Sequence, residues 1–237
     1  MAAAIEAADD VELVAGVSRS AAGQARIYGS VAEALDATQA DVLVEYTSAE
    51  AVKANVHAAI ERGVAVVIGS SGLCADEYEE IDALAREHGV GVIAAGNFSL
   101  LAALLLRSAA EIARYVGSWE IVDYASAQKP DVPSGTSREL AERLAEVRRP
   151  VVERPFDTLH GPVEARGATI AGTQIHSVRL PSFAVSTEIV FAAAGERLEL
   201  RHQPNESPEP YVAGTLLAVR AVRDRLGLTR GLDTLLA

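Results

Sequence analysis

Four apolar runs of strand length recur through the first part of the chain, and helix-like segments separate them. The runs are Val11–Val17, Val42–Tyr46, Val64–Ile68 and Val90–Ala95. Short β-rich runs that alternate with helices indicate a parallel sheet covered by helices on both faces. The sequence therefore predicts a Rossmann-like, doubly wound α/β domain, in which ligands bind beyond the carboxyl ends of the strands.

Polar residues after the strands fit helix starts. Ser30 is followed three residues later by Glu33, and Thr47 by Glu50, which is the spacing of an N-terminal capping box. Both pairs predict a helix that begins close to the end of a strand.

The pattern changes after residue 98. A long helix is expected over Leu100–Val116, and it is followed by a strand over Trp119–Tyr124. Further strand-like stretches are Thr169–Leu180, Ala184–Ala193 and Arg197–His202, and an amphipathic helix covers Tyr211–Leu226. We predict an α/β domain over residues 1–98, an α+β domain with an open mixed sheet over 99–208, and a C-terminal helical segment over 209–237.

Composition narrows the class of partner. The 237 residues are 49% hydrophobic, enough to bury a core, and the net charge of −12 disfavours nucleic acid and anionic membranes as partners. The longest apolar run, Leu100–Leu106, is too short to span a bilayer. Because the N-terminus lacks a signal-peptide pattern, we expect a cytoplasmic protein. A single cysteine, Cys74, excludes an intrachain disulfide and a multi-cysteine metal site, so no metal is expected.

The eight residues Lys129–Thr136, Lys-Pro-Asp-Val-Pro-Ser-Gly-Thr, are the most unusual stretch of the chain. They connect the strand over Trp119–Tyr124 to a helical pattern over Ser137–Val147. Thr136 and Glu139 have capping-box spacing, so the helix is expected to begin there.

A helix start gathers unpaired N–H donors and the positive end of the helix dipole, and Lys129 adds a full positive charge. We therefore predict a pocket for a small carboxylate or phosphate, formed by Lys129, Ser134, Gly135 and Thr136. A rigid turn with a solvated lysine fits the same residues equally well. Further cations for a dicarboxylate are available at Arg166 and within His176–Arg179, although residues on a strand surface would look the same.

The loop after its strand resembles the substrate loop of the 4-hydroxy-tetrahydrodipicolinate reductase (dihydrodipicolinate reductase) family. The similarity extends over nearly the whole chain. It includes Glu45–Thr47, Gly69–Gly72, Ala95–Ser99 and Gly195–Glu199.

The resemblance implies a cytoplasmic homotetramer of lysine and diaminopimelate synthesis that reduces a cyclic imine or enamine dicarboxylate with NADPH or NADH. Lys129 would be catalytic and would bind substrate together with Ser134, Gly135 and Thr136. The C-terminal helix would return to the first domain. Residues expected to contact the cofactor are Arg19, Tyr46, Thr47, Gly69, Ser70, Ser71, Asn97 and Phe98. Arg19 favours NADPH, because an arginine at this position accommodates a 2′-phosphate.

The chain departs from the family in three places. No glycine-rich pyrophosphate loop is found near the N-terminus, so we expect the first strand and its turn to be missing and dinucleotide binding to be weak. Ala125 and Ser126 stand where the family has a His-His pair, and neither side chain is a general acid near neutral pH. Asn205–Ser207 replaces a family arginine.

Three functions remain open at this point. The first is the reductase itself, and the second is a paralogous reductase of a different imine. The third is a non-catalytic protein that binds small anions and has lost the cofactor site.

Overall fold

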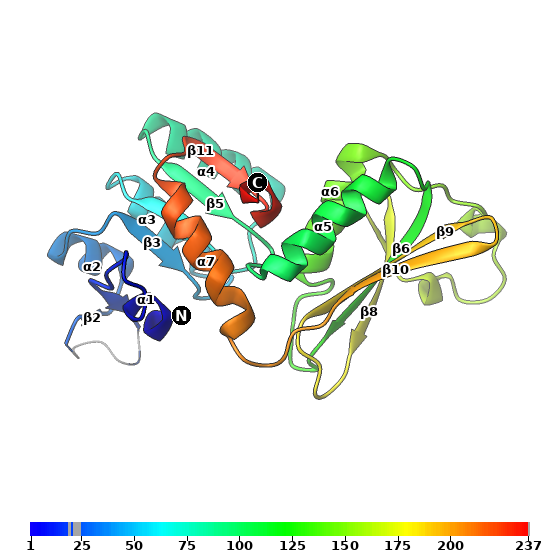
Figure 1. The fold of residues 1–237 in the computed structure, drawn as a ribbon, viewed down its shortest axis with the longest axis horizontal. Helices are drawn as coiled ribbons and strands as arrows, with labels where there is room; N and C mark the ends of the chain where they lie inside the picture. Colours follow the sequence, from blue (N-terminus) through cyan, green and yellow to red (C-terminus); the bar gives the residue numbers. More distant parts are fainter. Residues whose placement is uncertain (19, 21–24, 237) are drawn as a thin grey trace. The chain divides into compact units, whose positions relative to one another are not determined.

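The computed structural model describes residues 1–18, 20 and 25–236. The chain divides into two compact units (Figure 1). Unit 1 combines Met1–Phe98 with Tyr211–Ala237, and unit 2 is Ser99–Pro210. Within the described residues, no helix is long and apolar enough to cross a membrane.

Unit 1 is built on a four-stranded sheet in the order β11-β5-β4-β3, with every neighbouring pair parallel. Its strands are β3 (Val42–Glu45), β4 (Ala65–Ile68), β5 (Gly91–Ala94) and β11 (Gly227–Arg230). The parallel sheet confirms the Rossmann-like prediction. The sequence pattern did not predict β11, because Gly-Leu-Thr-Arg contains no apolar run.

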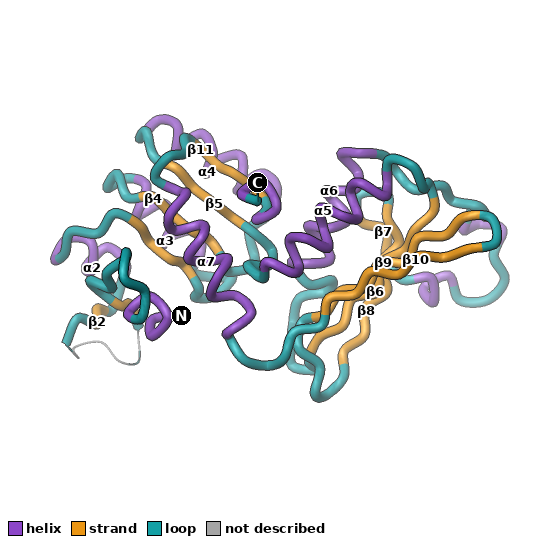
Figure 2. Tube along the Cα trace, in the orientation of Figure 1, coloured by secondary structure: helices purple, strands orange, loops and turns teal. Residues whose placement is uncertain are grey.

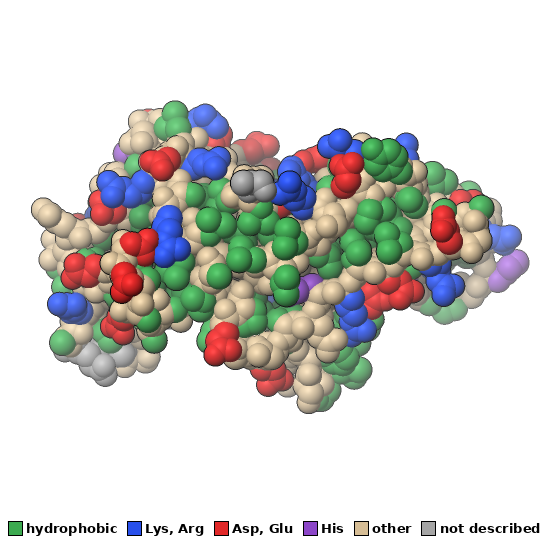
Figure 3. Space-filling view, in the orientation of Figure 1, with side chains coloured by type: hydrophobic (Ala, Val, Ile, Leu, Met, Phe, Trp, Pro, Cys, Tyr) green, Lys and Arg blue, Asp and Glu red, His purple; other side chains and the backbone are tan. Residues whose placement is uncertain are grey.

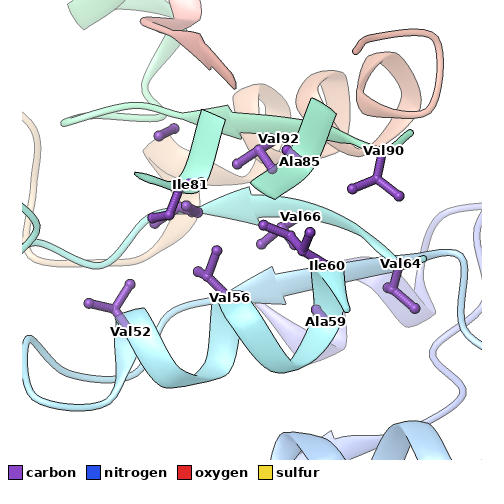
Figure 4. Close-up of a cluster of buried hydrophobic side chains, with 12 residues drawn as sticks. Val52, Val56, Ala59, Ile60, Val64, Val66, Ile81, Ala85, Val90 and Val92 are labelled. Atoms are coloured by element: carbon purple, nitrogen blue, oxygen red, sulfur yellow. The ribbon is translucent and has the colours of Figure 1, made fainter. Parts of the chain in front are cut away.

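Two helices, α3 (Val52–Ile60) and α4 (Ala75–Glu87), cover one face of this sheet. The side chains of α3 and α4 meet those of β4 and β5 in a continuous apolar cluster (Figure 4). Val56 and Ile81 are fully buried in the cluster. Each fully buried aliphatic side chain of this kind contributes about 1.5–3 kcal/mol relative to exposure.

The opposite face buries the alternate residues Val67 and Ile93. Helix α7 (Glu209–Val222) crosses this face of the sheet (Figure 1). Gly214 lets α7 lie close to the backbone of Phe98, because a Cβ at this position would lie 2.0 Å from the Phe98 carbonyl oxygen.

The strand predicted over Val11–Val17 is wrong over most of its length. Only β1 (Gly16–Val17) is a strand, and it pairs with β2 (Ile27–Tyr28) in a separate two-stranded parallel sheet. A strand requires a partner for its N–H and C=O groups, and in the described residues that partner begins at Ile27. The remaining helices of this region are α1 (Ala2–Glu6) and α2 (Val31–Ala37).

Unit 2 contains a five-stranded mixed sheet in the order β10-β9-β6-β8-β7. The strands are β6 (Ser118–Ala125), β7 (Ala168–Ile170), β8 (Thr173–Arg179), β9 (Ser186–Ala193) and β10 (Glu196–His202). Helices α5 (Leu100–Ala113) and α6 (Gly135–Val147) lie along one side of this sheet (Figure 2). Side chains of both helices pack on the buried face of β6, which alternates strictly along the strand. Short 3-10 helices span Phe156–Thr158, Val163–Arg166 and Leu232–Leu235.

The helix-start predictions have three different outcomes. Ser30 caps α2 as predicted, since its hydroxyl accepts a hydrogen bond from Glu33 N. The Thr47 prediction is wrong, because α3 begins at Val52. Its N-cap residue, Ala51, makes no side-chain capping hydrogen bond. The Thr136 prediction is wrong by two residues, because α6 begins at Gly135 with Ser134 as its N-cap.

Candidate functional site

The loop between β6 and α6 holds its own ion pair. Lys129 Nζ lies 2.9 Å from Asp131 Oδ1, and the two side chains are 24% and 32% exposed. Half-buried charges of opposite sign attract more strongly than exposed ones, since less water screens them. A ligand carboxylate at Lys129 would therefore share the ammonium with Asp131.

Ser134 is fully buried and connects the loop to strand β6. Its amide donates to Asp123 Oδ2 at 3.0 Å, and its hydroxyl donates to Asp123 Oδ1 at 2.6 Å. The same hydroxyl oxygen accepts from Ser137 N at 3.3 Å, which is the N-cap bond of α6. Asp123 thus positions Ser134, and Gly135 is the first residue of α6 after this N-cap.

Asp123 is a buried carboxylate that accepts hydrogen bonds from four residues. Besides Ser134, the donors are Ser137 Oγ at 3.1 Å, Ser177 Oγ at 3.1 Å and Arg179 NH2 at 2.7 Å. Burial alone would raise the pKa of Asp123, but the hydrogen bonds from Ser134 and Arg179 outweigh it and lower the pKa below its ordinary value. Sequence analysis missed this residue. Its signal was an acidic residue at a core-facing position of the alternating strand.

The other cations considered for a dicarboxylate are paired within the protein. Arg179 binds Asp123, whereas Arg166 binds Glu120 on the opposite face of β6. His176 Nε2 also lies 2.7 Å from Glu120. Lys129 is therefore the cation of the loop itself, and Arg179 reaches the loop only through its hydrogen bonds.

The two positions that depart from the family differ in their surroundings. Ala125 is fully buried at the end of β6, where it pairs with Arg179 across the sheet. Ser126 is partly exposed, and its carbonyl accepts from Lys129 N at 3.0 Å in the turn that follows the strand. Neither side chain is a general acid near neutral pH.

The carboxyl edge of the unit 1 sheet contains a buried carboxylate. Glu45 is 1% exposed at the end of β3. Its Oε1 accepts from Thr47 Oγ1 and, at 3.2 Å, from Asn55 Nδ2, whereas Oε2 has no partner in the described part of the chain. A buried acceptor of this kind is costly unless a donor reaches it.

Tyr46 connects the same edge to α7. Its hydroxyl lies 2.8 Å from Thr215 Oγ1, and Thr215 in turn donates its proton to Tyr211 O at 2.8 Å. Tyr46 is therefore the donor in the first bond. Desolvation of the hydroxyl raises the pKa of Tyr46 to about 12. The ring of Phe98, which is itself buried, packs edge-on against Tyr46 at a centroid distance of 6.0 Å.

The glycines of the loop after β4 make room for protein groups. A Cβ at Gly69 would lie 2.1 Å from the ring of Tyr46, and one at Gly72 would lie 2.4 Å from Ala49 Cβ. Ser70 Oγ accepts from Thr47 N at 2.8 Å, which joins the loops after β3 and β4. Tyr46 and Thr47 therefore lie beside Gly69 and Ser70 at the carboxyl edge of the sheet.

Most of the residues predicted to contact a cofactor lie in the loops that follow the strands of the unit 1 sheet. The loops after β3, β4 and β5 are at the carboxyl edge, where such folds bind their cofactors, and Glu45 Oε2 is an unused acceptor for a hydroxyl or amide donor. Asn97 follows β5 on the same edge. Arg19, predicted at the adenosine ribose, lies outside the described residues.

A chain with a parallel Rossmann-like sheet in one unit, a mixed sheet in the other, and this loop at the start of α6 belongs to the class of two-unit, nucleotide-dependent oxidoreductases. Residues 1–98 match the family described as "Dihydrodipicolinate reductase, N-terminus", and residues 99–236 match "Dihydrodipicolinate reductase, C-terminus". The chain belongs to the dihydrodipicolinate reductase family.

Individual relatives agree with this assignment. The 4-hydroxy-tetrahydrodipicolinate reductase of Moorella thermoacetica is 38% identical over 211 residues, which cover 89% of this chain and 78% of the relative. That of Cutibacterium acnes is 37% identical over 236 residues, with 98% and 91% covered. A dipicolinate-bound dihydrodipicolinate reductase from a Paenisporosarcina species superposes with a TM-score of 0.75 at 27% identity, covering 99% of this chain and 93% of that one.

No cluster of three or more metal-binding side chains occurs in the portion of the chain that the structure describes. On the face drawn in Figure 3, acidic and basic side chains are interspersed, and no large basic patch is seen.

Proposed function

We propose that the chain catalyses the NAD(P)H-dependent reduction of a cyclic imine or enamine dicarboxylate in lysine and diaminopimelate synthesis, as its resemblance to the family implies. The observation that carries the proposal is the loop from Lys129 to Thr136. A half-buried ammonium and the start of a 13-residue helix occur within eight residues of each other, in a chain of this family.

The residues of unit 2 would hold the substrate. The Lys129 ammonium and the positive end of the α6 dipole, at Gly135 and Thr136, would attract a carboxylate. Ser134 would support this helix start from behind through its bonds to Asp123. Two such contacts suit a ligand that carries carboxylates better than a neutral one.

The residues of unit 1 would hold the cofactor, which supplies a hydride when bound. Tyr46 and Thr47, with Gly69–Ser71 and Asn97–Phe98, would line the nicotinamide end, and Glu45 Oε2 would accept a hydrogen bond from it. We further propose that NADPH is preferred over NADH because of Arg19. Replacing Arg19 with Ala should remove the preference, and a preference of the unmodified protein for NADH would contradict it.

A second candidate, a reductase of a different imine, is favoured by one observation. Ala125 is fully buried and neither it nor Ser126 supplies an imidazole, so we infer that the proton donor differs from the His-His pair that the resemblance implies for the family. A substrate with a more basic ring nitrogen would need less help from a general acid. Comparing turnover of a panel of cyclic imines at several pH values distinguishes the two candidates.

The oligomeric state is also proposed from the family. Within the described residues, α5 and α6 pack on one side of the unit 2 sheet, and the other side carries the partly buried Val122, Val190 and Tyr124 beside charged residues. Apolar side chains on a sheet face that no α-helix of the described structure covers suit contact with another copy of the chain. We propose a homotetramer, located in the cytoplasm, and light scattering would test the subunit number.

Calorimetric titrations with NADPH and with pyridine-2,6-dicarboxylate, performed separately, test the proposed function. Both reductase candidates predict that the dicarboxylate binds and that the dinucleotide binds at least weakly, since this sequence has no glycine-rich pyrophosphate loop. Binding of the dicarboxylate without the dinucleotide would instead identify a small-anion-binding protein, and binding of neither would reject the loop as a ligand site.

A further inference from the structure

A buried ion pair connects the two limbs of the Lys129–Thr136 loop. Arg179 NH2 donates to Asp123 Oδ2 at 2.7 Å and also to the carbonyl oxygen of Asp131 at 2.8 Å. Asp123 accepts from the amide and the hydroxyl of Ser134. One guanidinium therefore holds the lysine-bearing limb, and its partner carboxylate holds the limb at the helix start.

The pair is shielded from water. Asp123 is fully buried, and the Arg179 side chain is 16% exposed. Arg179 NH1 adds a bond to Val178 O at 3.0 Å, which fixes the guanidinium to the end of β8. Because hydrogen bonds to charged groups are the stronger ones and here they converge from β6, β8 and α6, the loop has one strongly preferred conformation.

The charge of this pair matters for an anionic ligand. A lone buried carboxylate at Asp123 would lie directly behind the helix start and would repel a ligand carboxylate. Arg179 offsets the charge of Asp123, just as Asp131 pairs with Lys129, so that no uncompensated carboxylate lies behind the helix start. Breaking a buried pair by removing one partner leaves an uncompensated charge, which is worse than removing both.

We propose that Asp123 and Arg179 are positioning residues of the anion-binding loop, which fix both of its limbs without touching the ligand. The inference rests on the proposed function. Under this proposal, ligand affinity depends on the neutrality of the Asp123–Arg179 pair, although neither residue contacts the substrate.

If affinity depends on the neutrality of the Asp123–Arg179 pair, removing both charges should weaken ligand binding less than removing the arginine alone. Arg179→Met should raise the dissociation constant of pyridine-2,6-dicarboxylate at least tenfold. The double variant Asp123→Asn with Arg179→Met should recover at least half of that loss on a logarithmic scale, because neither charge remains. A purely structural role predicts the opposite, since losses from two damaged supports would add.

The experiment measures dissociation constants by calorimetry and amide exchange in residues 130–137 by mass spectrometry. Arg201→Met is the matched control, because Arg201 pairs with Glu188 between β10 and β9, away from the loop, with 3.6 Å between NH1 and Oε2. It should leave affinity unchanged. Arg179→Lys keeps the positive charge but loses the guanidinium that bonds both Asp123 and the Asp131 carbonyl, so this variant should fold. Amide exchange should become faster in the loop and should stay unchanged in β10.

The possible failures are distinguishable. The positioning role is rejected, and the proposed function stands, if Lys129→Ala weakens binding while Arg179→Met binds as tightly as the unmodified protein. The same conclusion follows if the losses of affinity from Asp123→Asn and from Arg179→Met add in the double variant. If the unmodified protein binds no dicarboxylate, the proposed function is rejected. The positioning role is then judged by amide exchange alone, and unchanged exchange in Arg179→Lys rejects it.

Discussion

The ammonium of Lys129 lies 2.9 Å from the carboxylate of Asp131, two residues further along the same loop. A carboxylate ligand therefore meets a cation that is already oriented, at the cost of a neighbouring negative charge. The first prediction follows from this relationship.

Replacing Lys129 with Ala should weaken the binding of pyridine-2,6-dicarboxylate about ten- to a hundredfold. A charge-assisted hydrogen bond shielded from water contributes about 1.5–3 kcal/mol, and about 1.4 kcal/mol corresponds to one decade of affinity. Calorimetry gives the constants. Lys53→Ala is the control, since its ammonium pairs with Glu80 at 2.7 Å in unit 1. Equal affinity of Lys129→Ala and the unmodified protein would show that the loop is not the anion site.

Introducing histidine should have different effects at the two positions that depart from the family. Ser126→His places an imidazole on a partly exposed turn, and it should raise the rate of imine reduction far more than substrate affinity, because a general acid acts in the transition state. Ala125→His should instead destabilise the fold by about 1–3 kcal/mol, since the position is fully buried. Steady-state kinetics and urea denaturation test both, and a stable Ala125→His variant would contradict the packing argument.

Tyr46 should make stability depend on alkaline pH. Its pKa is raised from 10.0 to about 12 in the folded protein, so the unfolded chain loses this proton first. The stabilising contribution is full below pH 10 and is lost as the pH rises toward about 12. The difference in unfolding free energy between the protein and Tyr46→Phe should shrink over this interval. Tyr115→Phe, at a side chain that is 79% exposed, is the control.

Gly69→Ala should destabilise unit 1 by about 1–3 kcal/mol, because the new methyl group would overlap the ring of Tyr46. Gly117→Ala is the control, since a Cβ there would meet only side-chain atoms at 3.5 Å. In a Tyr46→Ala background the cost of Gly69→Ala should largely disappear. Thermal unfolding measures all of these variants, and an undiminished cost in that background would indicate a backbone effect.

Most of the first unit could be predicted from periodicity. The runs at β4 and β5 are apolar and buried on both faces, and that pattern is typical of a buried parallel strand. The strand β11 was missed because its four residues are only half apolar, and its place depends on pairing with β5. Residues 11–15 have strand propensity but no partner in the described structure, and propensity does not provide one.

The candidate site was predictable where chemistry is local in sequence. Lys129 and the helix start after Pro133 lie within one short loop, so the residues alone indicated an anion site. Asp123 and Arg179 were not recognised as supports of that loop. They are 56 residues apart and meet only because β6 and β8 are neighbours in the sheet. A buried acidic residue in a strand shows that a partner exists, but periodicity cannot say which one.

The sheet of unit 1 includes β11, which comes from the last residues of the chain, whereas unit 2 is contiguous. A ribosome delivers Gly227–Arg230 after every other strand of both units. During synthesis, unit 2 can therefore fold first, while β5 keeps an unpaired edge and the face later covered by α7 stays open. Unit 1 begins first in the sequence but can be completed last. Until β11 pairs with β5, the nascent unit 1 is the part of the chain that a chaperone would have to protect.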